Sequence, residues 1–235
     1  MEAADLPSCF EGIEAGYRRA REEFGIRAQW IFDAVRQFGA EAALAVAQAA
    51  VSLRNRGVVG FSIGGDERGS PPELFREAFA YARSEGLRLT AHAGEAAGPD
   101  SVWSALRVLG VERIGHGLTA IADQHLLDHL MEWQVPLDVC VTSNVKTGCL
   151  SRAASHPLRN YFDKGLLVTL NTDDPALFGA DLNQEYLLAH RLFGFQPEEL
   201  TRLARNSFQA SFLPPEDKEF FLAAFPDATR SGPTA

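Results

Sequence analysis

Three largely apolar segments of this sequence, residues 87–91, 111–114 and 166–170, each lead into side chains that can bind a metal ion or transfer a proton. The polar residues at these three ends are His92 with Glu95, His116, and Asp173 with Asp174. Imidazole and carboxylate groups are zinc ligands, and a glutamate beside a metal can exchange protons with a substrate. Parallel α/β folds carry their chemistry at the carboxyl ends of the strands. We therefore expect these residues to share one rim of a parallel sheet.

Each of these residues also has a purely structural interpretation. His92 could be a hydrogen-bonded core histidine, with Glu95 a solvated neighbour. His116 stands between two glycines, which allow close approach of a ligand but also suit a tight turn. Asp174 precedes a proline and resembles a helix start, although this leaves Asp173 at an apolar strand end without a reason. Taken together the five residues favour a ligand site, since a structural protein needs no such set at one rim.

Two further strand ends are polar but lack a recognised catalytic motif. Gly64, Gly65 and Asp66 follow the segment at 58–63 and do not form the G-x-G-x-x-G pattern of dinucleotide-binding proteins. Ser143 lacks the G-x-S-x-G setting of a serine hydrolase. The remaining histidines lie on or just before predicted helices and are interpreted as surface or packing residues: His125, His129, His156 and His190.

Hydrophobic periodicity predicts six strands that alternate with helices. Strands are expected at 26–35, 58–63 and 137–141 and near residues 88, 112 and 167. Helices are expected at 7–24, 40–54, 70–86, 100–109, 123–133, 157–164, 181–192, 197–212 and 215–225, with a polar turn at 142–144 and a loose tail at 229–235. This alternation predicts an α/β fold with a parallel sheet and right-handed crossovers, forming one domain over residues 1–235.

The composition narrows the class of protein. The chain has 235 residues, 46% of them hydrophobic, which suits one large globular domain. A net charge of −9 disfavours nucleic acid or an anionic membrane as the main partner. No apolar run reaches the roughly 20 residues needed to span a bilayer. Three cysteines without a C-x-x-C spacing, and an acidic start without signal-peptide character, favour the reducing cytoplasm.

Five motifs together resemble the adenosine deaminase family over about residues 10–225. In chain order they are Gly64-Gly65-Asp66-Glu67, His92-Ala93-Gly94-Glu95, Arg113-Ile114-Gly115-His116-Gly117, Thr142-Ser143-Asn144 and Asn171-Thr172-Asp173-Asp174-Pro175. The resemblance implies a zinc-dependent TIM-type (β/α)₈ barrel that hydrolyses the 6-amino group of adenosine to give inosine. It also implies a purine nucleoside as the partner that the site binds.

The resemblance implies a role for each motif residue. His92 and Asp173 would be zinc ligands, and Glu95 would exchange a proton with purine N1. His116 would orient and polarise the water that attacks the purine. Substrate-binding roles fall to Asp174, at purine N7, and to the Gly65 backbone N–H, at purine N3.

The sequence departs from the family in two respects. The family's first strand carries a His-x-His pair that supplies two further zinc ligands, and this sequence has no such pair. Six predicted strands therefore indicate an incomplete barrel that lacks the first two. Ser62 stands where many relatives have aspartate. Adenine or aminodeoxyfutalosine thus stays open as the substrate, as does a truncated, non-catalytic remnant of the family.

Overall fold

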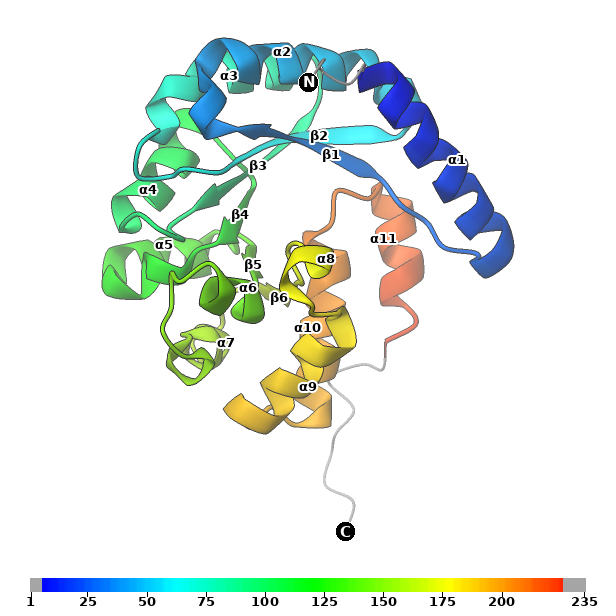
Figure 1. The fold of residues 1–235 in the computed structure, drawn as a ribbon. Coiled ribbons are helices and arrows are strands. Elements are labelled where there is room, and N and C mark those ends of the chain that lie inside the picture. Colours follow the sequence, from blue (N-terminus) through cyan, green and yellow to red (C-terminus); the bar gives the residue numbers. More distant parts are fainter. Residues whose placement is uncertain (1–5, 226–235) are drawn as a thin grey trace.

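The computed structural model describes residues 6–225, so the acidic start of the sequence and the tail expected at 229–235 lie outside it (Figure 1). The strands are β1 (Trp30–Val35), β2 (Val58–Gly64), β3 (Arg88–Ala93), β4 (Arg113–His116), β5 (Leu137–Val139) and β6 (Val168–Leu170). The helices are α1 (Leu6–Phe24), α2 (Gly39–Ser52), α3 (Arg76–Ser84), α4 (Pro99–Ser104), α5 (Gln124–Glu132), α6 (Val141–Lys146), α7 (Leu158–Asp163), α8 (Pro175–Phe178), α9 (Leu182–Phe193), α10 (Pro197–Ala210) and α11 (Pro215–Leu222).

All six strands belong to one parallel sheet in the order β1-β2-β3-β4-β5-β6. Each strand thus pairs with the next strand in the sequence, and a helical segment lies between them, which is the winding of a TIM-type barrel. Figure 1 shows the strands curving around a central space with α2 to α5 on the outside. The predicted α/β fold is confirmed, with six of the eight strands of a full barrel.

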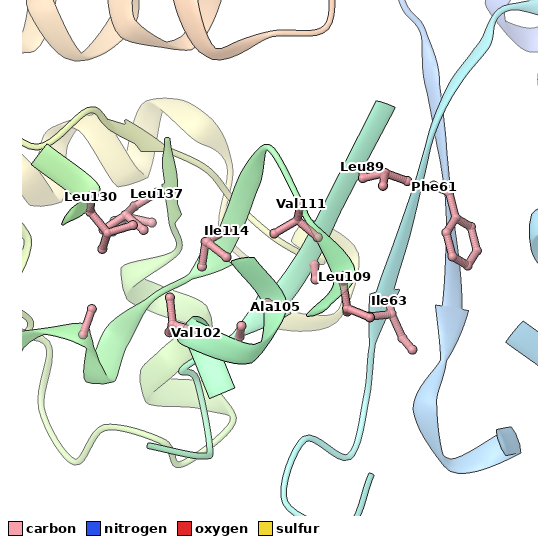
Figure 2. Packing of buried hydrophobic residues seen from close by; sticks show 14 of the residues in the cluster. Phe61, Ile63, Leu89, Val102, Ala105, Leu109, Val111, Ile114, Leu130 and Leu137 are labelled. Carbon is pink, nitrogen blue, oxygen red and sulfur yellow. The ribbon is translucent and has the colours of Figure 1, made fainter. Parts of the chain in front are cut away.

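The core lies between the strands and this outer layer of helices. Ile63, Leu89 and Ile114 project from three successive strands and are at most 1% exposed. Figure 2 shows them among Val102 and Leu109 from the helical segment after β3, which are equally buried. Burying such apolar side chains stabilises the fold by about 1.5–3 kcal/mol each. This packing holds the strands in the register that sets the positions of their carboxyl ends.

The helices α10 and α11 link the two outer strands of the sheet. The Asn206 side chain on α10 donates to the carbonyl oxygen of Val168 on β6, at 2.9 Å. On α11, Asp217 accepts a hydrogen bond from Arg27, which precedes β1, at 2.9 Å, and Phe221 lies under the same guanidinium. The C-terminal helices therefore contact both the last strand and the segment that leads into the first.

Several predicted boundaries were wrong. The strand expected at 26–35 begins only at Trp30. The helix expected from residue 70 begins as a 3₁₀ turn at Pro72, and Ser70 does not cap it, because its carbonyl oxygen instead accepts from Arg36. The helix expected at 100–109 has the predicted extent, although its second half, Ala105–Leu109, is a π-helical turn. The polar turn expected at 142–144 is part of helix α6.

Across residues 6–225, the helices are all too short or too polar to cross a membrane. Cys9, Cys140 and Cys149 are free thiols in this structure.

Candidate active site

The carboxyl end of β3 carries His92, and the neighbouring strand leaves room for its ring. Gly115 of β4 lies opposite His92 in the sheet register. A Cβ atom on Gly115 would lie 3.3 Å from the Cα of His92 and 3.4 Å from its ring. Only glycine avoids this crowding without moving one of the two strands. The glycine before His116 thus has a packing reason that the sequence pattern alone did not identify.

His116 and Asp173 both adopt backbone angles that residues other than glycine rarely adopt. Their φ values are 66° and 58°, in the left-handed region. Such a conformation costs on the order of 1–3 kcal/mol and is concentrated at functional sites. Three non-glycine residues within 6–225 have a positive φ; the third is Gln134, and the sequence pattern had placed the other two, His116 and Asp173, at strand ends.

The four predicted groups converge at one rim. The His116 Nε2 atom lies 3.0 Å from His92 Nδ1, 3.5 Å from a Glu95 carboxylate oxygen and 3.8 Å from an Asp173 carboxylate oxygen. His116 is 1% exposed, whereas the other three remain partly accessible. The sequence expectation that three strand ends meet is confirmed.

The first turn of α6 holds the carboxylates in place. Ser143 donates from its hydroxyl to Asp173 at 2.6 Å. Asn144 donates to Glu95 at 3.2 Å, and Thr147, one turn later, donates to the same oxygen at 3.3 Å. Sequence reasoning assigned Ser143 and Asn144 no role at the site beyond the family motif. The available signal was their place directly after β5, at the same rim as the other strand ends.

A buried carboxylate, Glu67, organises the turn that carries Glu95. Its oxygens accept hydrogen bonds from the backbone N–H groups of four successive residues, Gly94 to Ala97. The hydroxyl of Ser101 donates to it at 2.6 Å. Burial alone would raise the pKa of Glu67, but the bonds from Ser101 and from the backbone together lower it below its usual range. Glu67 is therefore ionised and locks the turn.

The pKa values of Glu95 and His116 are shifted in opposite directions. Partial burial, followed by the charge of Asp173, raises the pKa of Glu95, while His92 opposes this shift. Burial, followed by His92, lowers the pKa of His116 to about 4. A carboxyl with a raised pKa can keep a proton nearer to neutral pH, whereas an imidazole with a lowered pKa stays neutral there. Opposite shifts of this kind are common in acid–base sites.

A cavity of about 260 Å³ opens beside these groups. Its walls include His92, His116 and Asp173, together with Asp33 within β1 and Ser62 of β2. Asp33 and Ser62 are paired in the sheet register. Sequence reasoning missed Asp33, which no motif marks. A second cavity of about 300 Å³ lies among residues such as Val59 and Phe208 and is lined by none of the predicted site residues.

The two predicted substrate-binding residues lie near this rim but outside the cluster. Gly65 follows β2 with φ of 93°, and a Cβ there would collide with the Gln37 side-chain oxygen, so the position requires glycine. Asp174 is exposed at the position that precedes α8, and its side chain makes no capping hydrogen bond to that helix. The structural interpretation of Asp174 as a helix cap is therefore not supported by its side chain.

The donor set suits zinc, although it is small. Ligand-type atoms of His92, Glu95 and His116 lie within 4.8 Å of one another, and so do those of His116, Cys140 and Asp173. Imidazole, thiolate and carboxylate are the ligands that zinc takes in proteins. Catalytic zinc sites have three protein ligands, and the residues assigned as ligands from the sequence, His92 and Asp173, number two.

Comparison with known proteins identifies the family of this chain. The sequence profile of adenosine deaminase matches residues 3–225. The chain belongs to the adenosine deaminase family. It is 42% identical over 211 residues to the aminodeoxyfutalosine deaminase of Streptomyces avermitilis, covering 89% of this chain and 59% of that protein. It is 41% identical over 208 residues to the adenosine deaminase of Klebsiella pneumoniae, covering 88% and 62%. The chain thus spans less than two thirds of either relative.

Solved structures of similar proteins share the fold. The adenine deaminase from Arthrobacter aurescens superposes with a TM-score of 0.88 at 32% identity, covering 93% of this chain and 67% of that one. An amidohydrolase from Burkholderia ambifaria with bound zinc gives a TM-score of 0.86 at 30% identity, covering 92% and 60%. The prediction of adenosine deaminase family membership is confirmed. The names of these proteins refer to different substrates, namely aminodeoxyfutalosine, adenosine and adenine.

Proposed function

We propose that this chain carries the catalytic rim of a hydrolytic deaminase that acts on the 6-amino group of a purine nucleoside, with adenosine as the first candidate. The reaction takes up water and releases ammonia, converting adenosine to inosine. The observation that supports it is the convergence of His92, Glu95, His116 and Asp173 within hydrogen-bonding or ion-pair distance at one rim. Family membership supplies the reaction class.

The roles of the residues follow from their positions. His92 and Asp173 would hold a zinc ion, which when bound activates water as a nucleophile at neutral pH. Glu95, whose raised pKa favours the protonated form, would donate its proton to purine N1 as the ring is attacked. Asp174 would accept a hydrogen bond at purine N7, and the Gly65 N–H would donate to purine N3.

A second substrate has direct support from the comparisons. The identity to an aminodeoxyfutalosine deaminase, 42%, is as high as the identity to an adenosine deaminase, 41%. Both compounds present a 6-aminopurine, so the chemistry at Glu95 and His116 is the same for each. The part of the cavity near Asp33 and Ser62 would discriminate between adenosine and aminodeoxyfutalosine.

We further propose that residues 1–235 form a single metal-dependent hydrolase domain equivalent to the C-terminal three-quarters of the family fold, located in the cytoplasm. The two further zinc ligands would come from the strands of the family fold that precede β1. Without them the ion would be held weakly, because His92 and Asp173 are one ligand short of a catalytic zinc site.

The test measures ammonia release from adenosine, aminodeoxyfutalosine and adenine, using the chain alone and the chain co-expressed with the first two strands of the Klebsiella enzyme. Both preparations are supplied with zinc. We expect little or no turnover by the chain alone and zinc-dependent turnover of one nucleoside by the completed barrel. A folded, zinc-loaded completed barrel that releases no ammonia from any of the three would favour a non-catalytic member of the family.

A further inference from the structure

A buried histidine outside the rim, His156, has its proton position fixed by the backbone. It lies just before α7 and is 4% exposed. The backbone N–H of Leu158 donates to His156 Nδ1 at 3.0 Å. A backbone N–H can only donate, so Nδ1 must be the nitrogen without a proton. Burial lowers the pKa of His156 to about 4, so the ring is neutral at neutral pH and its single proton is on Nε2.

That proton fixes the orientation of the Asn144 amide. The His156 Nε2 atom lies 3.3 Å from the side-chain oxygen of Asn144, which is itself fully buried. An N–H facing the amide requires its oxygen there, so the Asn144 NH₂ group must point the opposite way. It meets Glu95 at 3.2 Å and His116 Nδ1 at 3.1 Å. Its two protons are thus both used.

The amide in turn fixes the proton of His116. An NH₂ group can only donate, so His116 Nδ1 must accept and cannot carry a proton. A proton on Nδ1, in either the other neutral tautomer or the charged ring, would face the amide proton directly. The remaining form carries its proton on Nε2, the atom that lies 3.0 Å from His92 Nδ1. Four groups are therefore linked in one direction, from Leu158 through His156 and Asn144 to His116.

We propose that His156 is a positioning residue that acts through Asn144 to hold His116 as the neutral tautomer with its proton on Nε2, directed into the site. In this form His116 presents its Nε2–H to His92 Nδ1 and has no lone pair at Nε2, so it does not ligate a metal through that atom. The effect on catalysis rests on the proposed function, whereas the tautomer itself does not. Treating His156 only as a packing residue, as the sequence suggested, overlooks this link.

The primary test is a nitrogen NMR spectrum of the metal-free chain labelled with ¹⁵N-histidine, because protonated and unprotonated ring nitrogens resonate in separate ranges. We expect both His156 and His116 to show an unprotonated Nδ1 and a protonated Nε2 at neutral pH. A protonated Nδ1 on either residue would overturn the proposal. This result depends on no activity, so it is distinct from any failure of the deaminase assay.

Variants then test the direction of the link. His156→Phe removes the donor to Asn144, and we expect the His116 signals to shift toward an average of the two tautomers. His156→Gln keeps a donating NH₂ in its place and should restore the wild-type His116 signals. His125→Gln, on the exposed side of α5, should leave them unchanged. Wild-type His116 signals in a folded His156→Phe variant would contradict the proposal, and the wild-type spectrum decides alone if that variant does not fold.

Discussion

At the scale of single residues, Glu95 has the clearest chemical assignment. Its pKa is raised by partial burial, and two donors, Asn144 and Thr147, meet one of its oxygens. The other oxygen lies 3.5 Å from His116 Nε2. This arrangement leaves the carboxyl able to hold a proton while its direction is fixed. A proton-transfer role requires both features.

We expect Glu95→Gln to lower the deamination rate of the completed barrel by about 10²–10⁴-fold while zinc content is unchanged, because the amide keeps the hydrogen bonds but cannot transfer a proton. The measurement is the initial rate of ammonia release together with metal analysis. Glu198→Gln, an exposed carboxylate at the start of α10, is the matched control and should keep the full rate. Wild-type turnover by Glu95→Gln would remove Glu95 from its role.

The sequence predicted the rim residues but not the groups that orient them. His92, His116 and Asp173 could be found because few structural roles place a ligand-type residue at the end of an apolar strand. His156 and Asn144 could not, because each acts through a contact between segments whose relative placement only the fold determines. Asp33 was missed for the same reason, since it faces the cavity from a strand whose end carries no motif.

At the scale of elements, the turn between β3 and α4 depends on one carboxylate. Glu67 accepts from four backbone N–H groups and from Ser101, and no regular secondary structure satisfies those donors. Leaving buried donors unpaired costs about 1–3 kcal/mol for each group. The turn that carries Glu95 is therefore stabilised by a side chain from the segment that follows β2.

We expect Glu67→Gln to lower the free energy of unfolding by at least about 2 kcal/mol at neutral pH, because its NH₂ group would face donors that need an acceptor. The folded-state pKa of Glu67 is below its usual value of 4.5. Its contribution is thus present above that value and is lost as the pH falls through the folded pKa, so the variant and wild type should converge in acid. Urea unfolding at several pH values measures this.

Glu73→Gln is the matched control for this prediction, since Glu73 is exposed and its side chain is bonded to the hydroxyl of Ser104. It should cost less than about 1 kcal/mol. A Glu67→Gln variant as stable as this control would show that the turn does not depend on the carboxylate.

Elements were predicted well where periodicity was strong and poorly at their ends. The six strands and their order follow from apolar runs that alternate with helical patterns. Helix α6 was expected as a turn because Thr142 to Asn144 are polar and weak helix formers. The side chains of Ser143 and Asn144 instead bond to Asp173, Glu95 and His116. These long-range contacts stabilise a helix that the local sequence alone does not favour.

At the scale of the whole molecule, the sheet has two outer strands, β1 and β6. Asn206 bonds to β6, whereas β1 pairs with one strand only within residues 6–225 and presents Ile31 at 37% exposure on the face that lines the cavity. Exposed strand edges favour pairing between chains. The number of strands could be counted from the sequence, but the way in which α10 and α11 link the outer strands could not, because it depends on long-range contacts such as that of Arg27 with Asp217.

We expect the chain alone to self-associate in a concentration-dependent manner, and Ile31→Lys to reduce this association by placing an inward-pointing charge on the outer strand β1. Sedimentation velocity over a range of concentrations provides the measurement. Leu177→Lys is the control and changes a residue that is 79% exposed on α8. It tests whether a lysine at any exposed apolar position reduces association, and we expect it to have little effect. A monomer at all concentrations would contradict the expectation.

The rim formed by these strand ends should hold a metal through His92 and Asp173, and every catalytic role proposed above depends on that ion. Zinc titration of the chain by calorimetry provides the sharpest test, with three variants that differ by one group each. We expect weak binding of one ion by the wild type and no measurable binding by Asp173→Ala. Ser143→Ala, which removes the hydrogen bond to Asp173, should weaken binding by about 10–100-fold, and Asp174→Ala, the adjacent carboxylate, should leave it unchanged. Wild-type zinc affinity in a folded Asp173→Ala variant, or an equal loss in Asp174→Ala, would show that the metal is not held in this way.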